Sequence, residues 1–262
     1  MYPILFSIGS FSVHTYGVFA AIGFLAGVAV VKYMSRELKL DVETMVDFTF
    51  WNMLLGFVGA RILFVFTRLE YFMGDPLAIF RIWEGGLVFY GGLILDIAFS
   101  FWYTKKKNIS MWTALDVMTP ALAIAHMFGR FGCFSAGCCY GRPTDSIFGV
   151  RFNSELVDVS LRGVPLHPTQ LYEAFALFVV FLGLMWVFKR RRFVGQVGLT
   201  YMIVYPIVRI CVEYFRGDQI RGFVIQDYLS TSQFISVILV SIAIVVFIRR
   251  AGSAMRASGR PA

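Results

Sequence analysis

The chain has 262 residues, of which 58% are hydrophobic and only 15% are charged, and its mean hydropathy is +0.71. A soluble domain of this length carries about 25% charged residues, so the composition excludes an ordinary soluble protein. It indicates an all-α polytopic integral membrane protein. The net charge of +8 comes from basic clusters between hydrophobic runs, where they mark topology and not nucleic-acid binding.

Seven hydrophobic runs predict about seven transmembrane helices. They cover residues 11–33, 46–66, 86–103, 111–128, 171–188, 197–215 and 233–248. Several lie near the lower limit of about 17 residues for a span. No linker-like segment divides the chain, so we expect a single integral membrane domain over residues 1–262, with a short disordered tail from Ala251 onward.

Basic residues follow alternate runs, at residues 32–39, 105–107, 189–192 and 249–250. Because cytoplasmic loops are enriched in lysine and arginine, we expect the N-terminus outside and the C-terminus inside. The first run lacks a basic n-region and a clear cleavage site, which favours a retained helix over a signal peptide. Residues 129–168 are too long for a simple turn and predict a small extracytoplasmic cap.

Polar residues gather in the outer halves of the predicted spans. The rise of 1.5 Å per helical residue gives the depth of each residue in its run, and most of the runs contribute to this set. Its members are His14, Tyr16, Arg61, Tyr90, Arg130, His167, Gln170, Glu173, Arg209 and Glu213. Charges within a bilayer are expensive and usually face a cavity or a partner. Their convergence on one leaflet predicts a polar site there. Asp96 lies nearer mid-membrane and has no assigned role.

The stretch 129–141 reads Gly-Arg-Phe-Gly-Cys-Phe-Ser-Ala-Gly-Cys-Cys-Tyr-Gly. Its glycines allow turns and close backbone approach, and Arg130 at a helix end is suited to hold an anion. Cys133 is expected to form a disulfide with Cys138 or Cys139 if the loop faces an oxidising compartment. The alternative is that one of these cysteines is a redox-active or acyl-accepting thiol. A metal site is not expected, because the cysteine spacing fits no common ligand pattern.

Two further segments combine polar side chains. Tyr205, Arg209 and Glu213 are spaced four residues apart and share one helical face. Two interpretations of that face are possible. Arg209 and Glu213 form an internal ion pair with a structural role, with Arg61 as a further partner, or Glu213 holds Arg209 so that the arginine can bind an anionic headgroup. The segment 167–173, His-Pro-Thr-Gln-Leu-Tyr-Glu, has the residues of a helix N-terminus, which leaves its histidine and glutamine unexplained.

Six motifs in the same order resemble the bacterial prolipoprotein diacylglyceryl transferases. They are "FSIGSFSVHTYG", "WEGGLVFYGGL", "GRFGCFSAGCCYGR", "HPTQLYE", "YPIVRICVEYFRGD" and "LSTSQFIS". The resemblance covers nearly the whole chain. It implies transfer of the diacylglyceryl group of phosphatidylglycerol to the lipobox cysteine of a prolipoprotein signal peptide, with release of glycerol 1-phosphate. It also implies the bacterial cytoplasmic (inner) membrane, with the active site toward the outer leaflet and no cofactor.

The resemblance and the polar pattern together assign residues to roles. Catalytic roles are expected for Arg130, Arg209, Tyr90, His167 and Glu213. Substrate contacts are expected from Tyr16, Arg61, Gly129, Gly132, Cys133, Gly141, Gln170, Tyr205 and Arg216.

The chain departs from the family pattern at three positions. The family usually has histidine at Tyr90, asparagine at Cys133 and an acidic residue at Cys138. Tyrosine, with an unperturbed pKa of about 10, is a poor base, so the base for the thiol is unassigned, with His167 favoured by topology and His126 next. The alternatives are a paralogue with the same phospholipid pocket and another acceptor, a non-catalytic lipid-binding protein, and a transporter.

Overall fold

The computed structural model describes residues 3–9, 11–81, 85–217, 223–225 and 229–257. The chain separates into two compact units, one formed by Met1–Val30 with Leu115–Ala262 and the other by Val31–Ala114. The expectation of one undivided domain stays a prediction.

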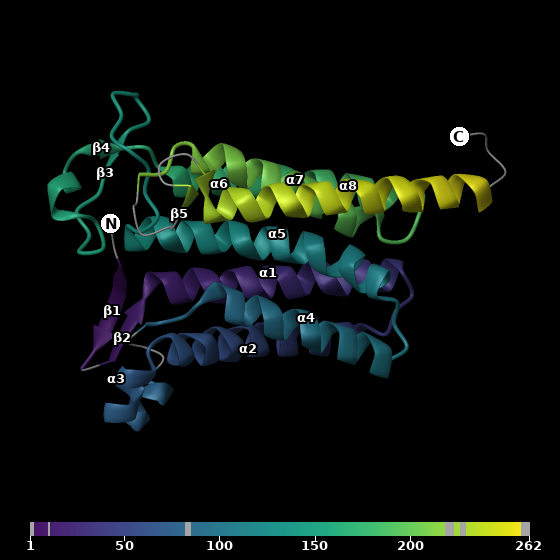
Figure 1. The fold of residues 1–262 in the computed structure, drawn as a ribbon, viewed down its shortest axis with the longest axis horizontal. Coiled ribbons are helices and arrows are strands. Elements are labelled where there is room, and N and C mark those ends of the chain that lie inside the picture. The colour runs from purple at the N-terminus through teal and green to yellow at the C-terminus, as the bar shows by residue number, and fades with distance from the viewer. Residues whose placement is uncertain (1–2, 10, 82–84, 218–222, 226–228, 258–262) are drawn as a thin grey trace. The chain divides into compact units, whose positions relative to one another are not determined.

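The smaller unit is built on two helices that lie side by side, α2 (Val42–Thr67) and α4 (Phe89–Lys106) (Figure 1). Glycines allow this approach: a Cβ added to Gly59 would lie 2.5 Å from the Gly91 carbonyl oxygen, and one added to Gly92 would lie 2.5 Å from that of Gly56. Small residues at such crossings let membrane helices pack backbone to backbone. Along the chain, α2 is followed by α3 (Leu69–Gly74) and the 3-10 helix η1 (Pro76–Phe80), which precede α4.

Arg61 on α2 organises the segment that leads into α4. Its guanidinium donates to the carbonyl oxygens of Ala78, Ile79, Arg81, Gly85 and Gly86, at 2.5 to 3.3 Å. An arginine has five N–H donors, so these bonds account for all of them and leave none for a substrate anion. Arg61 therefore supports the fold here, and its expected contact with a substrate stays a prediction.

The larger unit contains the first part of α1 (Thr15–Glu37), most of α5 (Met111–Ala136), and three helices that run together in Figure 1: α6 (Thr169–Arg190), α7 (Gln196–Glu213) and α8 (Thr231–Ala257). Ile124 and Met127 of α5 pack against Ala174 and Leu177 of α6 in its core. The buried carboxylate of Asp116 accepts from the backbone N–H groups of Gly195 and Gly198, at 2.7 and 3.0 Å, and so caps the start of α7.

Residues 137–168, here called the cap, have little regular structure, whereas residues 129–136 of the segment predicted as a cap belong to α5. The cap contains two paired strands, β3 (Val150–Arg151) and β4 (Pro165–Leu166), and the 3-10 helix η3 (Val159–Leu161). Its own core consists of Tyr140, Phe152, Val157 and Leu166. Two further antiparallel pairs are β1 (Ile4–Ile8) with β2 (Phe11–His14), and β5 (Phe223–Ile225) with β6 (Leu229–Ser230).

Each of the seven predicted runs coincides with a helix, and the protein is an all-α polytopic membrane protein. Within the described residues, six helices are long and apolar enough to cross a membrane, and α4 is not among them. Three predicted boundaries were wrong. The first run was expected to start at residue 11, but Phe11–His14 form β2 and α1 begins at Thr15. Helix α5 continues through Gly132 to Ala136 and does not end at Phe128, and α8 continues to Ala257 where a disordered tail was expected. Residues 258–262 of that tail lie outside the described residues.

Candidate functional site

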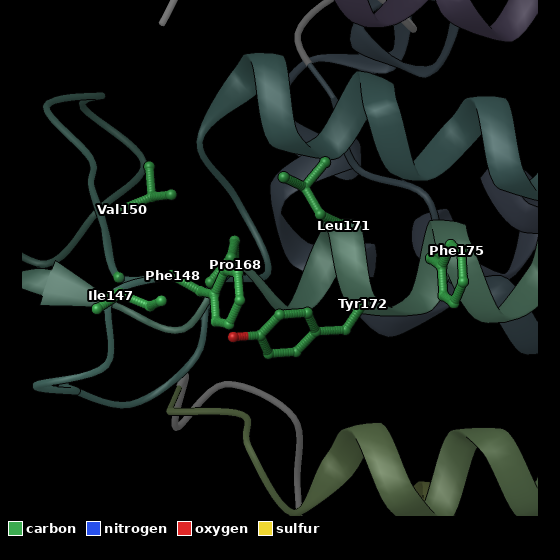
Figure 2. Close-up of a pocket in the computed structure, with 8 residues that line it drawn as sticks. Ile147, Phe148, Val150, Pro168, Leu171, Tyr172 and Phe175 are labelled. Atoms are coloured by element: carbon green, nitrogen blue, oxygen red, sulfur yellow. The ribbon is translucent and has the colours of Figure 1, made fainter.

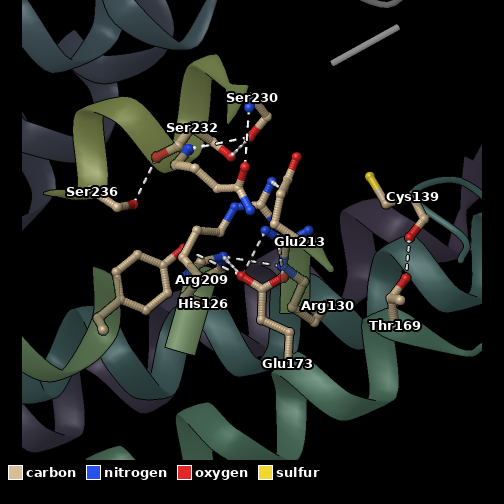
Figure 3. Close-up of polar contacts among 12 residues, drawn as sticks. His126, Arg130, Cys139, Thr169, Glu173, Arg209, Glu213, Ser230, Ser232 and Ser236 are labelled. Atoms are coloured by element: carbon tan, nitrogen blue, oxygen red, sulfur yellow. Dashed lines mark hydrogen bonds and ion pairs between the residues drawn. The ribbon is translucent and has the colours of Figure 1, made fainter. Parts of the chain in front are cut away.

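Glu173 of α6 lies at the centre of a buried ion-pair cluster in the larger unit (Figure 3). Its side chain is almost fully buried, with 2% of its surface exposed. Arg130 of α5 places Nη2 at 3.0 Å from Glu173 Oε1, and Arg209 of α7 places Nη1 at 3.4 Å from Oε2. One carboxylate thus joins arginines from two other helices, and both arginines are among the residues for which a catalytic role was expected.

Three more side chains complete the cluster. Arg209 Nη2 lies 2.7 Å from Glu213 Oε2, which confirms the predicted contact between this arginine and Glu213. The Tyr205 hydroxyl donates to Glu173 Oε1 at 3.2 Å. His126 accepts a hydrogen bond at Nε2 from Arg130 Nε, at 3.2 Å, and packs edge-on against the Tyr205 ring. An Nε2 that accepts belongs to a neutral imidazole.

Helical spacing explains why these side chains meet. His126 and Arg130 are four residues apart on α5, and Tyr205, Arg209 and Glu213 are four apart on α7, so each set lies along one face. Glu173 lies on the buried face of α6, together with Gln170, Ala174 and Leu177. The two polar faces meet over that carboxylate, inside the helical part of the unit.

The charges of the cluster balance, with two arginines against two glutamates. Each arginine side chain keeps 14% of its surface exposed. Among the described residues, Arg130 Nη1 and Arg209 Nε have no hydrogen-bond partner, so both guanidinium groups retain donors for an added anion. The cluster can therefore accept a phosphate next to its own ion pairs, where a water-poor setting strengthens the attraction.

The predicted signature loop is tied to α6 by the His-Pro-Thr-Gln segment. The Gln170 side chain donates to the Cys138 carbonyl oxygen at 2.6 Å, and the Thr169 hydroxyl donates to that of Cys139 at 2.7 Å. Both side chains are buried. Their observed partners are loop carbonyls, so they position the loop. Contact between Gln170 and a substrate stays a prediction.

His167 lies apart from the arginines in its described contacts. Its Nδ1 is 3.2 Å from the Tyr172 hydroxyl, and its ring packs against Phe215 at 5.3 Å between centroids. Burial and, to a lesser degree, the Arg142 guanidinium lower the pKa of His167 from its ordinary value. The histidine that the structure brings to Arg130 is His126, and a catalytic role for His167 stays a prediction.

Two signature glycines occupy tight positions. A Cβ on Gly132 would lie 2.8 Å from the ring of Tyr16, and a Cβ on Gly141 would lie 2.5 Å from the Cβ of His167. The Gly141 N–H donates to the His167 carbonyl oxygen, and Gly141 forms an isolated bridge with Arg216. Gly129 faces open space. These contacts place Tyr16, Gly132, Gly141 and Arg216 in the same unit as the arginines.

Tyr90 belongs to the other unit, in the first turn of α4. Its side chain is 40% exposed, and its ring packs edge-on against Phe89. Because Tyr90 and the arginines belong to different units, its expected catalytic role stays a prediction. Asp96 of the same unit has one carboxylate oxygen, Oδ1, that is buried and without a hydrogen-bond partner among the described residues.

Glu173 and His126 were noted in the sequence as polar residues, but neither was placed among the expected catalytic or substrate-binding residues. Glu173 was interpreted as an acidic residue in the first turn of a helix, and His126 was only the second choice among the histidines. A signal existed for both. Each is a polar residue inside an apolar run, and His126 lies one turn from Arg130. That signal does not tell which neighbouring helix supplies the partner.

An apolar pocket of about 580 Å³ lies between the cap and α6 (Figure 2). Its lining includes Phe148 and Val150 of the cap and Leu171, Tyr172 and Phe175 of α6. These α6 residues lie on a different face from Gln170 and Glu173. The pocket carries no charged side chain, so it suits a hydrocarbon group and not an anion.

Comparison with known proteins identifies the family. The model for "Prolipoprotein diacylglyceryl transferase" matches residues 3–249. The chain belongs to the prolipoprotein diacylglyceryl transferase family. It is 34% identical over 247 residues to the phosphatidylglycerol–prolipoprotein diacylglyceryl transferase of Clostridium tetani, covering 94% of this chain and 97% of that protein. The corresponding protein of Oceanobacillus iheyensis is 30% identical over 253 residues, covering 94% and 87%.

A second numbered member from Clostridium perfringens, "diacylglyceryl transferase 2", is 33% identical over 239 residues, covering 90% of each chain. The family match confirms the resemblance that six short motifs indicated. Members of the diacylglyceryl transferase family are named as transferases. Arg130 and Arg209, the two arginines for which the resemblance implies catalytic roles, both contact Glu173.

Proposed function

We propose that this protein transfers the diacylglyceryl group of phosphatidylglycerol to the lipobox cysteine of a prolipoprotein signal peptide. One observation carries the proposal: Arg130 and Arg209, from different helices, converge on the buried Glu173 in a chain of this family. The relatives' names supply the two substrates. The arginine pair supplies a site for the charged part of the lipid.

The first step is capture of the lipid phosphate. The unpaired N–H groups of Arg130 and Arg209 donate to phosphate oxygens, and Glu173 and Glu213 hold both guanidinium groups in place. Planar guanidinium groups bind phosphate through paired hydrogen bonds. As the phosphate becomes the leaving group, its growing negative charge strengthens these bonds, which lowers the barrier.

The second step is attack by the acceptor sulfur on the terminal glyceryl carbon of the diacylglyceryl group. A C–S bond forms as the C–O bond to the phosphate breaks. The leaving glycerol 1-phosphate takes the electron pair, and the thiol proton must pass to a base. The free thiol has a pKa of about 8.5, so the protein has to promote its ionisation.

We further propose that the N-terminus faces outward in the bacterial cytoplasmic membrane and that the site opens toward the outer leaflet. The alternating basic clusters support this orientation. Reporter fusions after Lys107 and Arg192 are expected to read cytoplasmic. A periplasmic signal at either position would overturn the orientation.

The decisive experiment follows labelled phosphatidylglycerol in the presence of a lipobox peptide. Transfer of the label to the cysteine peptide, and not to a serine version, is the expected result. Lipid that binds without transfer would indicate a lipid-binding protein or a different acceptor. An unlabelled peptide together with no lipid binding would refute the proposal.

A further inference from the structure

Three of the four cysteines converge at the end of α5, although their spacing in the sequence fits no common metal motif. Cys133, Cys138 and Cys139 are free cysteines, each half-buried. Their sulfur atoms all lie within 4.8 Å of one another. Cys211, the fourth cysteine, is exposed on α7.

The way α5 ends explains how the first two cysteines meet. Gly137 follows the last helical residue with φ of +79°. The Cys138 N–H donates to the Cys133 carbonyl oxygen at 3.1 Å, and the Gly137 N–H donates to that of Phe134 at 3.2 Å. These are the two bonds of a Schellman motif, which brings the side chains at its first and last positions together. Here those positions are Cys133 and Cys138.

The backbone conformation of Cys139 brings in the third sulfur. Its φ is +61°, a left-handed conformation that costs a residue with a side chain about 1 kcal/mol or more. The bonds from Gln170 to the Cys138 carbonyl and from Thr169 to the Cys139 carbonyl hold this turn. Figure 3 shows the Cys139 sulfur pointing away from Thr169. Both carbonyls are therefore anchored from α6, and the Cys138 thiol donates to the Cys133 carbonyl oxygen at 3.7 Å, which turns its sulfur toward Cys133.

We propose that Cys133, Cys138 and Cys139 bind a thiophilic divalent ion of the zinc type through three thiolates. Zinc–sulfur bonds of about 2.3 Å place tetrahedral ligands about 3.8 Å apart. Sulfur atoms that already lie within 4.8 Å need to move by no more than about 1 Å to meet that spacing. Thiolates are the ligands that select such soft or borderline ions.

The same geometry leaves a fourth position open. Among the described residues, no histidine, aspartate or glutamate joins the three sulfur ligands in this cluster. An ion with three protein ligands and one exchangeable position is typical of catalytic and not of structural zinc sites. Three thiolates on a divalent ion carry a net charge of −1, and Arg130 lies three residues before Cys133 on the same helix, where it offsets that charge.

The open position suggests a use that rests on the proposed function. A thiol that coordinates a metal ion loses its proton, so the acceptor cysteine would bind as a thiolate and release its proton to solvent. The site would thereby supply the thiol activation that Tyr90 is poorly suited to provide. The acceptor sulfur would then lie on the loop that Thr169 and Gln170 anchor beside the arginine cluster.

Metal binding is tested first, without lipid or peptide. The full-length protein, reduced and in detergent, is dialysed against Zn²⁺ and analysed for metal, and Co²⁺ is then used as a spectroscopic stand-in. We expect about one ion per chain and near-ultraviolet thiolate-to-cobalt absorption. Cys133→Ser, Cys138→Ser and Cys139→Ser should each weaken Zn²⁺ binding by at least about 100-fold.

Cys211→Ser is the matched control, since it removes a thiol outside the cluster, and its Zn²⁺ affinity and cobalt spectrum should equal those of the parent. Absence of bound ion, or a Cys139→Ser spectrum identical to the parent's, would overturn the site. So would thiol counting on the untreated protein that finds two of the three cysteines joined in a disulfide. None of these results bears on diacylglyceryl transfer, which is measured separately.

Thiol activation is tested on the cobalt-loaded protein. A lipobox peptide with cysteine should shift the cobalt spectrum, and its serine version should not. A cobalt spectrum that changes with neither peptide would overturn the proposal that the metal ion activates the acceptor thiol, even where the labelled-lipid assay shows transfer.

Discussion

Replacing Glu173 with glutamine keeps the size and shape of the side chain and removes the charge that joins two arginines. The two ion pairs that lose their negative charge are Oε1 with Arg130 at 3.0 Å and Oε2 with Arg209 at 3.4 Å, although the amide oxygen can still accept from one arginine. At an effective dielectric constant of 20, each ion pair corresponds to roughly 5 kcal/mol of gross attraction. Most of that is offset by desolvation. Breaking one side of a buried ion pair typically costs about 3–5 kcal/mol.

A loss of this size should lower the melting temperature of the detergent-solubilised protein by about 10 °C. Because the variant leaves the arginines with excess positive charge, anionic phosphatidylglycerol should stabilise it more than it stabilises the parent. Phosphatidylcholine, which has no net charge, should not. Thermal unfolding in mixed micelles of each lipid measures both effects.

Glu155→Gln is the matched control, because it makes the same change on an exposed side chain of the cap. Its melting temperature should stay close to that of the parent, within about 0.5 kcal/mol of stability. Equal melting temperatures for Glu173→Gln and Glu155→Gln would contradict the buried ion pairs of Glu173. So would equal stabilisation of the Glu173 variant by phosphatidylglycerol and phosphatidylcholine.

Arg209→Ala should reduce diacylglyceryl transfer by about 100-fold or more, and Arg209→Lys should recover little because the planar fork is lost; near-normal transfer by the alanine variant would remove this arginine from the mechanism. Tyr90→His should be tolerated and should raise transfer to a lipobox cysteine, since a histidine with a pKa of about 6.5 can accept the thiol proton; equal, negligible transfer in both proteins with lipid still bound would show that the acceptor site has diverged. Gly141→Ala should destabilise the protein by about 1–3 kcal/mol, because the new Cβ would lie 2.5 Å from that of His167. Gly183→Ala on α6, which meets nothing within 4 Å, should leave thermal stability unchanged or slightly higher, and equal melting of the two alanine variants would contradict the close approach at Gly141.

The helices could be predicted from the sequence because lipid imposes one strong rule: long apolar segments bond their backbone internally. The end of α5 could not. Four glycines in residues 129–141 all look like places to stop, yet Gly132 lies within the helix, where the Tyr16 ring packs closely against it. The helix ends at Gly137, whose φ of +79° makes the turn. Composition does not distinguish a glycine that admits a neighbour from one that makes a turn.

The site was predicted in part for a similar reason. The Tyr205, Arg209 and Glu213 face is a local pattern, and the structure confirms its internal ion pair. Glu173 serves residues on two other helices, and that arrangement depends on how α5, α6 and α7 pack. Spacing along one helix contains no information about which partner lies across from it.

The role of Arg61 affects how loss-of-function variants of this protein should be interpreted. Its five N–H groups hold the carbonyls of the chain just before α4, and Tyr90 lies in the first turn of that helix. A screen for inactive variants would therefore score Arg61 as essential alongside Arg130 and Arg209. The kind of defect would distinguish them, because an Arg61 variant should lose the folded segment before α4 with or without lipid. An inactive phenotype alone therefore does not show which arginine binds a phosphate.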